Sequence, residues 1–148
     1  MDKTVSRYNL EEQIVASTRR AIAAAILYSH QVAERLGLGA SDAQFMTLLE
    51  VHGPLTPGQL AELTGLRTGT VTGVLDRLEA ARFIRRERDP DDRRKVIVSR
   101  NEDEIDKRVN PHYAPQAAGM TAMLADYDDE QVALIADFMA RVATRRAG

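Results

Sequence analysis

Apolar residues recur at helical spacing along most of this chain, and the first such pattern is the longest. It runs from about Asn9 to Leu36 without Gly or Pro and ends at Gly37-Leu38-Gly39. Its apolar positions cover two faces rather than one, and a helix of about 28 residues is about 42 Å long. That is longer than a small domain needs to cover itself. We therefore expect this helix to be buried against a second protein chain.

Two short helices are predicted next. The first covers Asp42–His52 and is capped by Ser41. The second covers Gly58–Thr64, because Thr56 is a good N-cap residue and Pro57 suits the first helical position, where its missing N–H costs nothing. Two leucines of this second helix are expected to face inward, Leu60 and Leu63.

A third short helix is predicted after Gly65, which supplies a sharp turn. Its apolar residues are spaced i, i+3, i+4 and i+7 and so form one face: Val71, Val74, Leu75 and Leu78. The opposite face is small and polar, a surface that can approach the edges of DNA bases closely. It carries Thr68, Thr70, Thr72, Gly73 and Arg77. The spacing indicates a helix-turn-helix whose second helix reads DNA, with a solvated helix face as the alternative.

Two runs rich in β-branched and apolar residues follow, Phe83–Arg88 and Lys95–Ser99. The segment between them, residues 89–94, reads Asp-Pro-Asp-Asp-Arg-Arg and has the composition of a turn. We expect a β-hairpin, or wing, beside the third helix, with Leu55 pairing against it as a short strand. Asp76 is expected to be structural and to pair with an arginine of the wing, because a carboxylate that faces phosphates would repel them.

The pattern after the hairpin is helical but interrupted. Asn101 with Glu104 three residues later predicts a capping box that opens a helix. Pro111 and Pro115 cannot lie inside a helix without kinking it, so we expect a break or sharp kink at Asn110–Ala114.

The last apolar pattern predicts a helix over Asp129–Arg146. Asp128 with Gln131 forms a second capping box at its start. Its apolar stripe is Val132, Ile135, Met139 and Val142. We expect the long first helix and the helices after the hairpin to pack across a two-fold axis with a second copy of the chain.

These motifs resemble the MarR family of bacterial winged helix-turn-helix transcriptional regulators. The resemblance covers about a third of the chain and is carried by Gly65-Leu66, Thr70-Val71-Thr72 and Leu75-Asp76-Arg77-Leu78-Glu79, then by Arg85-Arg86, residues 89–94 and Val98-Ser99. The Asp-x-Arg of the wing, Asp92 to Arg94, is the best-known signature of that family. The resemblance implies a mainly α fold with a small β-hairpin wing.

The resemblance also implies one domain over residues 1–148. A winged helix-turn-helix core at about 41–100 would lie between dimerisation helices at about 9–37 and 101–146. The implied function is that of a homodimeric regulator, a repressor, that binds double-stranded DNA at a pseudo-palindromic operator. The residues expected to contact DNA are Arg67, Thr68, Thr70, Thr72, Arg77, Arg86, Arg88, Arg93 and Arg94. For the last two, a solvated turn or a local pair with Asp91 or Asp92 is the alternative.

Many members of that family bind a small, often phenolic, anion in a cleft between the dimer helices and the winged domain. Residues of this chain that could line such a cleft are Tyr28, His30, Phe45, Met46, Leu49, His112 and Tyr113. Plain core packing is the alternative for these side chains and the simpler one.

Charge is distributed unevenly along the chain. The net charge is −2. Residues 67–100 contain ten Arg or Lys against six Asp or Glu, a local balance of +4, so the remainder carries −6. Phosphates respond to the local field, which is screened over roughly 8–10 Å at physiological salt, and not to the charge of the whole chain. The asymmetry favours a DNA-binding face on an acidic body.

Composition excludes several other classes of function. With no Cys, the chain has no disulfide, no thiolate metal site and no cysteine redox sensor. Its three His residues lack the i, i+3 or i+4 spacing of a helical metal site, so no metal or cofactor is expected. We find no nucleophilic triad order and no phosphate loop, so an enzyme is not expected. No apolar run approaches 18 residues and no signal segment is present, which predicts a cytoplasmic protein without a membrane partner. The remaining rival is a winged-helix module that binds protein and not DNA.

Overall fold

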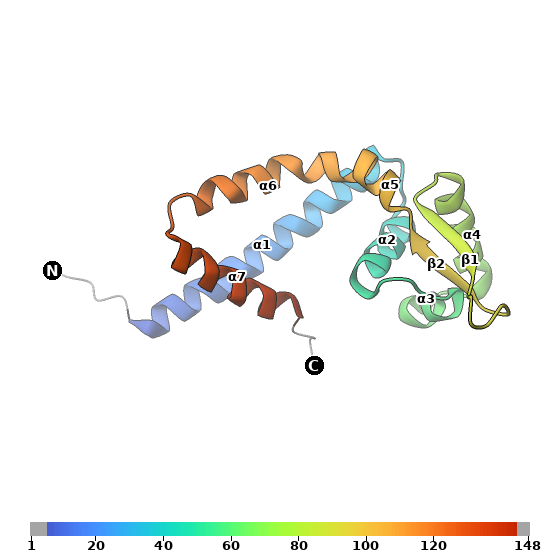
Figure 1. Ribbon diagram of the computed structural model, residues 1–148, viewed down its shortest axis with the longest axis horizontal. Helices are drawn as coiled ribbons and strands as arrows, with labels where there is room; N and C mark the ends of the chain where they lie inside the picture. Colours follow the sequence, from blue (N-terminus) through green and yellow to red (C-terminus); the bar gives the residue numbers. More distant parts are fainter. Residues whose placement is uncertain (1–5, 145–148) are drawn as a thin grey trace. The chain divides into compact units, whose positions relative to one another are not determined.

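The computed structural model describes residues 6–144 (Figure 1). In chain order the elements are α1 (Arg7–Arg35), α2 (Ala40–His52), α3 (Pro57–Thr64), α4 (Thr68–Ala80), β1 (Ile84–Arg88), β2 (Val96–Arg100), α5 (Glu102–Glu104), a π-helical turn (Ile105–Val109), α6 (Asn110–Leu124) and α7 (Asp129–Thr144). This confirms the mainly α fold with a small hairpin. The chain divides into two compact units, Met1–Val109 and Asn110–Gly148. A single domain over 1–148 stays a prediction.

The hydrophobic core of the first unit lies among α2, α3, α4 and the hairpin. The four apolar positions predicted on α4, Val71, Val74, Leu75 and Leu78, are each at most 1% exposed. They pack with Phe45, Leu49, Leu55, Leu60, Phe83, Ile84, Val98 and Ile105. The inward orientation predicted for Leu63 is wrong, because Leu63 is 48% exposed. In a helix of two turns only one narrow face meets the core, and in α3 that face is Leu60 with Ala61.

The two strands pair antiparallel, with Ile84 opposite Arg100 and Arg88 opposite Val96. Leu55 forms the expected extra bridge, exchanging N–H···O bonds of 3.0 and 2.7 Å with Val98. The wing is therefore attached to the segment that leads into α3. This attachment fixes the base of the hairpin on the helical core.

Helix starts follow the sequence in one case and depart from it in another. Thr56 caps α3 through a capping box with Gln59, with bonds of 3.1 and 2.8 Å. Ser41 was predicted to cap α2, but this is wrong, because Gly39 occupies the N-cap position. The Asp42 carboxylate accepts a 3.0 Å hydrogen bond from the Gly39 N–H, so α2 begins two residues earlier than predicted.

Of the break or sharp kink predicted at Asn110–Ala114, the break is wrong and the kink stays a prediction. The chain is helical from Asn110 to Leu124, with Pro115 inside α6. The departure from α geometry comes one turn earlier, as the π-helical turn Ile105–Val109. A proline removes a hydrogen bond and its ring crowds the preceding turn. The wider π turn directly before Pro111 accommodates this change of hydrogen-bond register without ending the helix.

The two predicted capping boxes near the C-terminus have different outcomes. Asp128 and Gln131 form theirs, with bonds of 3.0 and 2.9 Å. Asn101 makes no side-chain cap and instead bonds elsewhere, as described below. The described part of α7 ends at Thr144, and the last two residues of the predicted helix lie outside the described residues.

Three helices bury little of their apolar surface. In α1 the buried residues are Val32 and Ala33, and no described residue of α6 or α7 is buried. Their exposed large apolar residues include, in α1, Leu10, Ile14, Val15, Ile22, Ile26 and Leu27, and, in α6 and α7, Met120, Met123, Leu134, Phe138, Met139 and Val142. No described helix is long and apolar enough to cross a membrane.

Candidate nucleic-acid interface

The polar side of α4 is exposed, opposite its buried stripe. Thr68, Thr70 and Thr72 are all exposed, and Arg67 precedes them at the N-cap position with an extended backbone. Helical spacing separates this side into two rows. One row continues from Thr68 and Thr72 toward the wing, and the other contains Thr70, Gly73 and Arg77 at i, i+3 and i+7.

Arg77 is bound on its inner edge by a buried carboxylate. Its Nη2 and Nε donate to Asp42 Oδ1 at 2.9 and 3.3 Å. The Asp42 side chain is only 8% exposed, whereas that of Arg77 is 60% exposed. Arg77, one of the residues predicted to contact DNA, is therefore also part of an ion pair that joins α4 to α2.

Arg86 links the wing to α4. It donates to Asp76 Oδ1 at 2.7 Å and to the two carboxylate oxygens of Glu79 at 2.9 and 3.0 Å. These bonds raise the pKa of Arg86 and lower that of Glu79 from its ordinary value of 4.5. The pairing of Asp76 with a wing arginine is confirmed. Because the Arg86 guanidinium is already bound to two carboxylates, its main contribution is to orient the hairpin against α4.

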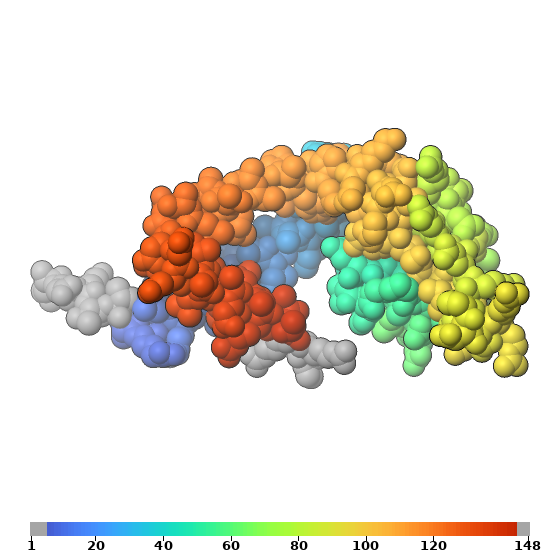
Figure 2. Space-filling model, in the orientation of Figure 1, coloured from blue at the N-terminus to red at the C-terminus, as the bar shows by residue number. Residues whose placement is uncertain are grey.

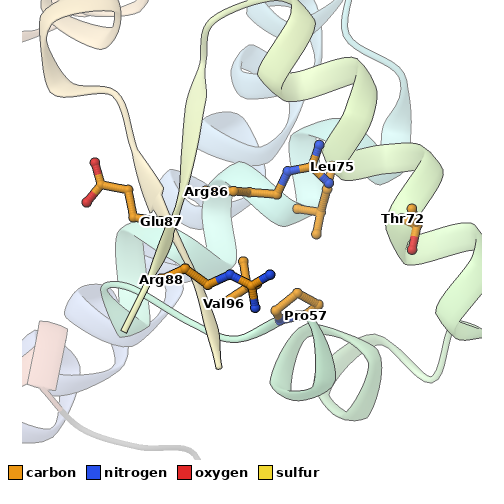
Figure 3. Close-up of a pocket in the computed structure, with 7 residues that line it drawn as sticks. All are labelled: Pro57, Thr72, Leu75, Arg86, Glu87, Arg88 and Val96. Atoms are coloured by element: carbon orange, nitrogen blue, oxygen red, sulfur yellow. The ribbon is translucent and has the colours of Figure 1, made fainter. Parts of the chain in front are cut away.

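A hollow of about 320 Å³ lies between the start of α3, α4 and the wing. Figure 3 shows Arg86 and Arg88 extending from β1 toward it, with Glu87 pointing away. Thr72 of α4 and Pro57 of α3 line the same hollow. In the space-filling view the hairpin and α4 adjoin at the surface (Figure 2). The structure thus brings together three of the predicted contact residues, Thr72, Arg86 and Arg88.

The tip of the wing is shaped by local bonds. Asp92 Oδ1 accepts from the backbone N–H of Arg94 at 3.1 Å and from its Nε at 3.3 Å. Arg88 Nη1 donates to the carbonyl of Arg93 at 3.2 Å, which connects the tip to the hollow. The Arg94 side chain is 93% exposed in spite of its contact with Asp92. The local pair that was the alternative for Arg94 is present, and it leaves most of the guanidinium in solvent.

The C-terminal end of α4 has an unusual residue in a left-handed conformation. Arg82 has φ = +66°, where Gly is the usual choice. The Arg82 N–H donates to Glu79 O at 2.9 Å and the Phe83 N–H to Leu78 O at 2.9 Å, which is a Schellman motif. Phe83 and Leu78 are both buried, as the motif's apolar contact requires. This turn directs the chain from α4 into β1.

A buried carboxylate fixes that turn to the segment after the wing. Glu104, with a side chain 9% exposed, pairs with Arg82 at 3.1 Å and with Arg108 at 3.5 Å. Arg108 also donates to Ala81 O at 2.7 Å and lies 4.2 Å from the centre of the Phe83 ring.

Asn101 adds two bonds to the same cluster. It donates to Arg82 O at 2.9 Å and accepts from Arg85 at 2.8 Å. The sequence analysis missed this cluster, because it assigned Glu104 to a capping box with Asn101, whereas Glu104 pairs with Arg82 and Arg108. The one available signal was Asn101, a residue that bonds backbone groups readily outside helices.

The residues predicted to line an effector cleft separate into three groups. Phe45 and Leu49 belong to the hydrophobic core and Met46 packs against it, as the alternative of plain packing expects. His30 is exposed on α1. The remaining three, Tyr28, His112 and Tyr113, are partly buried.

Helices α2, α3 and α4, together with the hairpin and the Leu55 bridge, form a winged helix-turn-helix, a class of DNA-binding fold. Residues 40–96 match the model of the MarR family. The chain is 33% identical over 138 residues to the uncharacterized HTH-type transcriptional regulator YcgE of Bacillus subtilis, covering 93% of this chain and 89% of that protein. The protein therefore belongs to the MarR family of transcriptional regulators, which confirms the resemblance seen in the sequence.

Solved structures agree on the fold. The transcriptional regulator Tm0710 from Thermotoga maritima aligns with a TM-score of 0.61 at 23% identity, covering 88% of this chain and 92% of that one. The F27L mutant of S. aureus MepR, bound to an oligodeoxyribonucleotide, aligns with a TM-score of 0.51 at 16% identity, covering 93% and 95%. At these identities the likeness establishes the shared fold alone.

Proposed function

We propose that the protein is a repressor that binds double-stranded DNA sequence-specifically as a homodimer. The observation that supports it most is a hollow lined by both Thr72 of α4 and Arg88 of the wing. The hydrogen bond from Arg88 to the Arg93 carbonyl connects this surface to the wing tip with Arg93 and Arg94. This surface lies in the segment 67–100, which carries a net +4 on an acidic chain. In the proposal α4 enters the major groove and the wing tip contacts the adjacent backbone or minor groove.

The individual DNA contacts are part of the same proposal. Arg67, Thr68, Thr70, Thr72 and Arg77 would act from α4, where their side chains are exposed. Arg88, Arg93 and Arg94 would act from the wing, while Arg86 would act mainly by orienting it. We expect the threonines to influence which sequence is bound and the wing arginines to contribute affinity for any duplex.

The exposed apolar residues of α1 and α7 support the dimer. Ile22 and Ile26 in α1, and Leu134 and Phe138 in α7, are i, i+4 pairs that lie along one side of their helices and are each 44–71% exposed. Apolar surface of this extent marks an interface more often than a solvated surface. A two-fold dimer would present two copies of α4 about one DNA turn apart and would require a pseudo-palindromic operator.

Control by a small, phenolic anion completes the proposal and rests on family membership. Its test is whether such an anion releases the protein from its operator in vitro, with a matched neutral alcohol as the control. A protein that acts on DNA in this way would work in the cytoplasm. A reporter gene placed behind the operator tests repression, since its expression should rise when the regulator is deleted.

The decisive experiment selects bound duplexes from a random DNA pool and measures their affinity against salt concentration. If each protomer neutralises about three to five phosphates, log K should fall against log salt with a slope of roughly −6 to −9 for the dimer. Enrichment of one palindromic motif supports the proposal. A protein that enriches no motif, or binds without salt dependence, would instead be the rival, a winged-helix module that binds protein.

A further inference from the structure

Asp42 is a buried carboxylate that bonds two helices at once. One oxygen, Oδ2, accepts from the Gly39 N–H at 3.0 Å at the start of α2. The other, Oδ1, accepts from Nη2 and Nε of Arg77, 35 positions along the chain on α4. A buried carboxylate must be paired, because leaving its charge unsatisfied is costly. Since the backbone of α2 fixes one oxygen, the other fixes where the Arg77 guanidinium lies.

Asp42 uses only one edge of that guanidinium. A guanidinium carries five N–H donors in a rigid planar fork, and Asp42 accepts from Nε and Nη2. Nη1 lies 3.9 Å from the point where a Cβ on Gly73 would be, one turn back along α4. The Arg77 side chain therefore runs toward the N-terminal half of α4, the direction that helical side chains usually take.

Because Gly73 has no side chain, it leaves an open surface on α4 against which the Arg77 guanidinium lies. Glycine in the interior of a helix is less favourable than alanine, so its presence in α4 needs a reason. A Cβ here would meet Arg77 in ordinary van der Waals contact, and a longer side chain would occupy the space of the guanidinium. The row Thr70, Gly73 and Arg77 thus combines a hydroxyl, an open patch of backbone and an oriented guanidinium.

We propose that Asp42 is a positioning residue for DNA recognition, and that it orients Arg77 so that the Nη1 edge faces a base in the major groove. The inference rests on the proposed function and deepens it. A forked guanidinium in a fixed orientation can bond two acceptors of a guanine edge, which a freely rotating one does less well. Asp42 makes no DNA contact of its own in this scheme and acts through Arg77.

The test is a double-mutant cycle on DNA binding. The probes are the duplex that the wild-type protein enriches from a random pool and a scrambled duplex of the same length. Asp42→Asn keeps an oxygen for the start of α2 but removes the charge that orients Arg77. We expect Asp42→Asn and Arg77→Ala each to weaken binding to the enriched duplex about tenfold, and binding to the scrambled duplex much less. In the Arg77→Ala background, Asp42→Asn should have no further effect.

A conservative variant separates orientation from charge. Arg77→Lys retains the positive charge but lacks the fork, so it should lose discrimination as fully as Arg77→Ala. This variant also serves if Asp42→Asn does not fold, because the Arg77 side chain is mostly exposed. The matched control is Asp103→Asn, which removes an exposed partner of Arg85 at 3.4 Å and should leave binding unchanged.

Four results would overturn the inference. Losses from Asp42→Asn and Arg77→Ala that multiply would show that Asp42 does not act through Arg77. Full binding by Arg77→Lys would show that charge alone matters. A wild-type protein that enriches no duplex would remove the proposed function as well, whereas a loss with Arg94→Ala and none with Arg77→Ala would remove this inference alone.

Discussion

The winged helix and the three helices α1, α6 and α7 differ in where their apolar side chains lie. In the winged helix, side chains such as Phe45, Leu60 and Leu78 are completely buried within the same chain. In α7 the comparable residues Leu134 and Phe138 are 71% and 44% exposed. Burying a large apolar side chain contributes about 1.5–3 kcal/mol. The winged helix obtains this stabilisation within one chain, whereas α1 and α7 would obtain it from a second copy.

This difference indicates a division of roles. The self-contained part carries the surface proposed to bind DNA, and its geometry is fixed by internal ion pairs. In the proposed dimer, the part with exposed apolar helices would set how two such surfaces are spaced.

The largest effect is expected in the core of the winged helix. Leu78→Ala should lower the free energy of unfolding by about 2–5 kcal/mol, because Leu78 is 0% exposed and its removal leaves a cavity. Urea denaturation followed by circular dichroism measures it. Val51→Ala, at a residue 70% exposed at the end of α2, is the control and should cost far less. Equal losses from the two changes would contradict the assignment of the core.

A charge on α7 tests the other side of the comparison. Phe138→Glu should weaken self-association about 100-fold or more, since a carboxylate would be buried in an apolar interface without a partner. Sedimentation velocity over a concentration series measures the shift from dimer to monomer. Asp137→Glu, beside it on the same helix, keeps the charge pattern and should leave association unchanged. A variant that stays dimeric would place the interface elsewhere.

Removing the carboxylate charge of Glu104 beside the C-terminal end of α4 is expected to have an intermediate effect on stability. Glu104→Gln should destabilise the protein by about 1–3 kcal/mol, because it leaves Arg82 and Arg108 without the carboxylate that both contact. Thermal and urea unfolding measure the loss. Asp103→Asn, one residue earlier and with a side chain 91% exposed, should be nearly neutral. A neutral Glu104→Gln would mean that Arg108 stabilises the turn through Ala81 and Phe83 alone.

The sequence predicts the winged helix well because its signals are local. The i, i+3, i+4 and i+7 spacing of the α4 stripe is a property of one helix, and so is the Thr56 N-cap. The hairpin follows from two β-rich runs around a turn. The break predicted at the prolines was wrong because the local rule that proline ends a helix takes no account of the π-helical turn that accommodates Pro111.

The ion pairs could not be predicted in the same way. Asp42 and Arg77 are 35 positions apart, and the sequence holds 22 acids and 20 Lys or Arg residues that could pair in many ways. Tertiary packing alone selects the partners. Asp76 was the exception, because its position on the outer face of the helix predicted to read DNA left a wing arginine as its natural partner.

The smallest predicted effect concerns the joint between α4 and the wing. Arg86 lowers the pKa of Glu79 below 4.5, so the folded state binds this proton less readily than the unfolded state. Stability from the pair is therefore fully present above pH 4.5 and is lost as the pH falls through the lower folded pKa. Because the Glu79 side chain is 43% exposed, the contribution should stay below about 1 kcal/mol.

Urea unfolding of wild type and Glu79→Gln at pH 6 and pH 3 measures this contribution. The free energies of unfolding of the two proteins should differ at pH 6, and the difference should shrink at pH 3. Glu62→Gln, exposed on α3, is the control. A difference that persists at pH 3 would show that Glu79 stabilises the joint by packing and not by its charge.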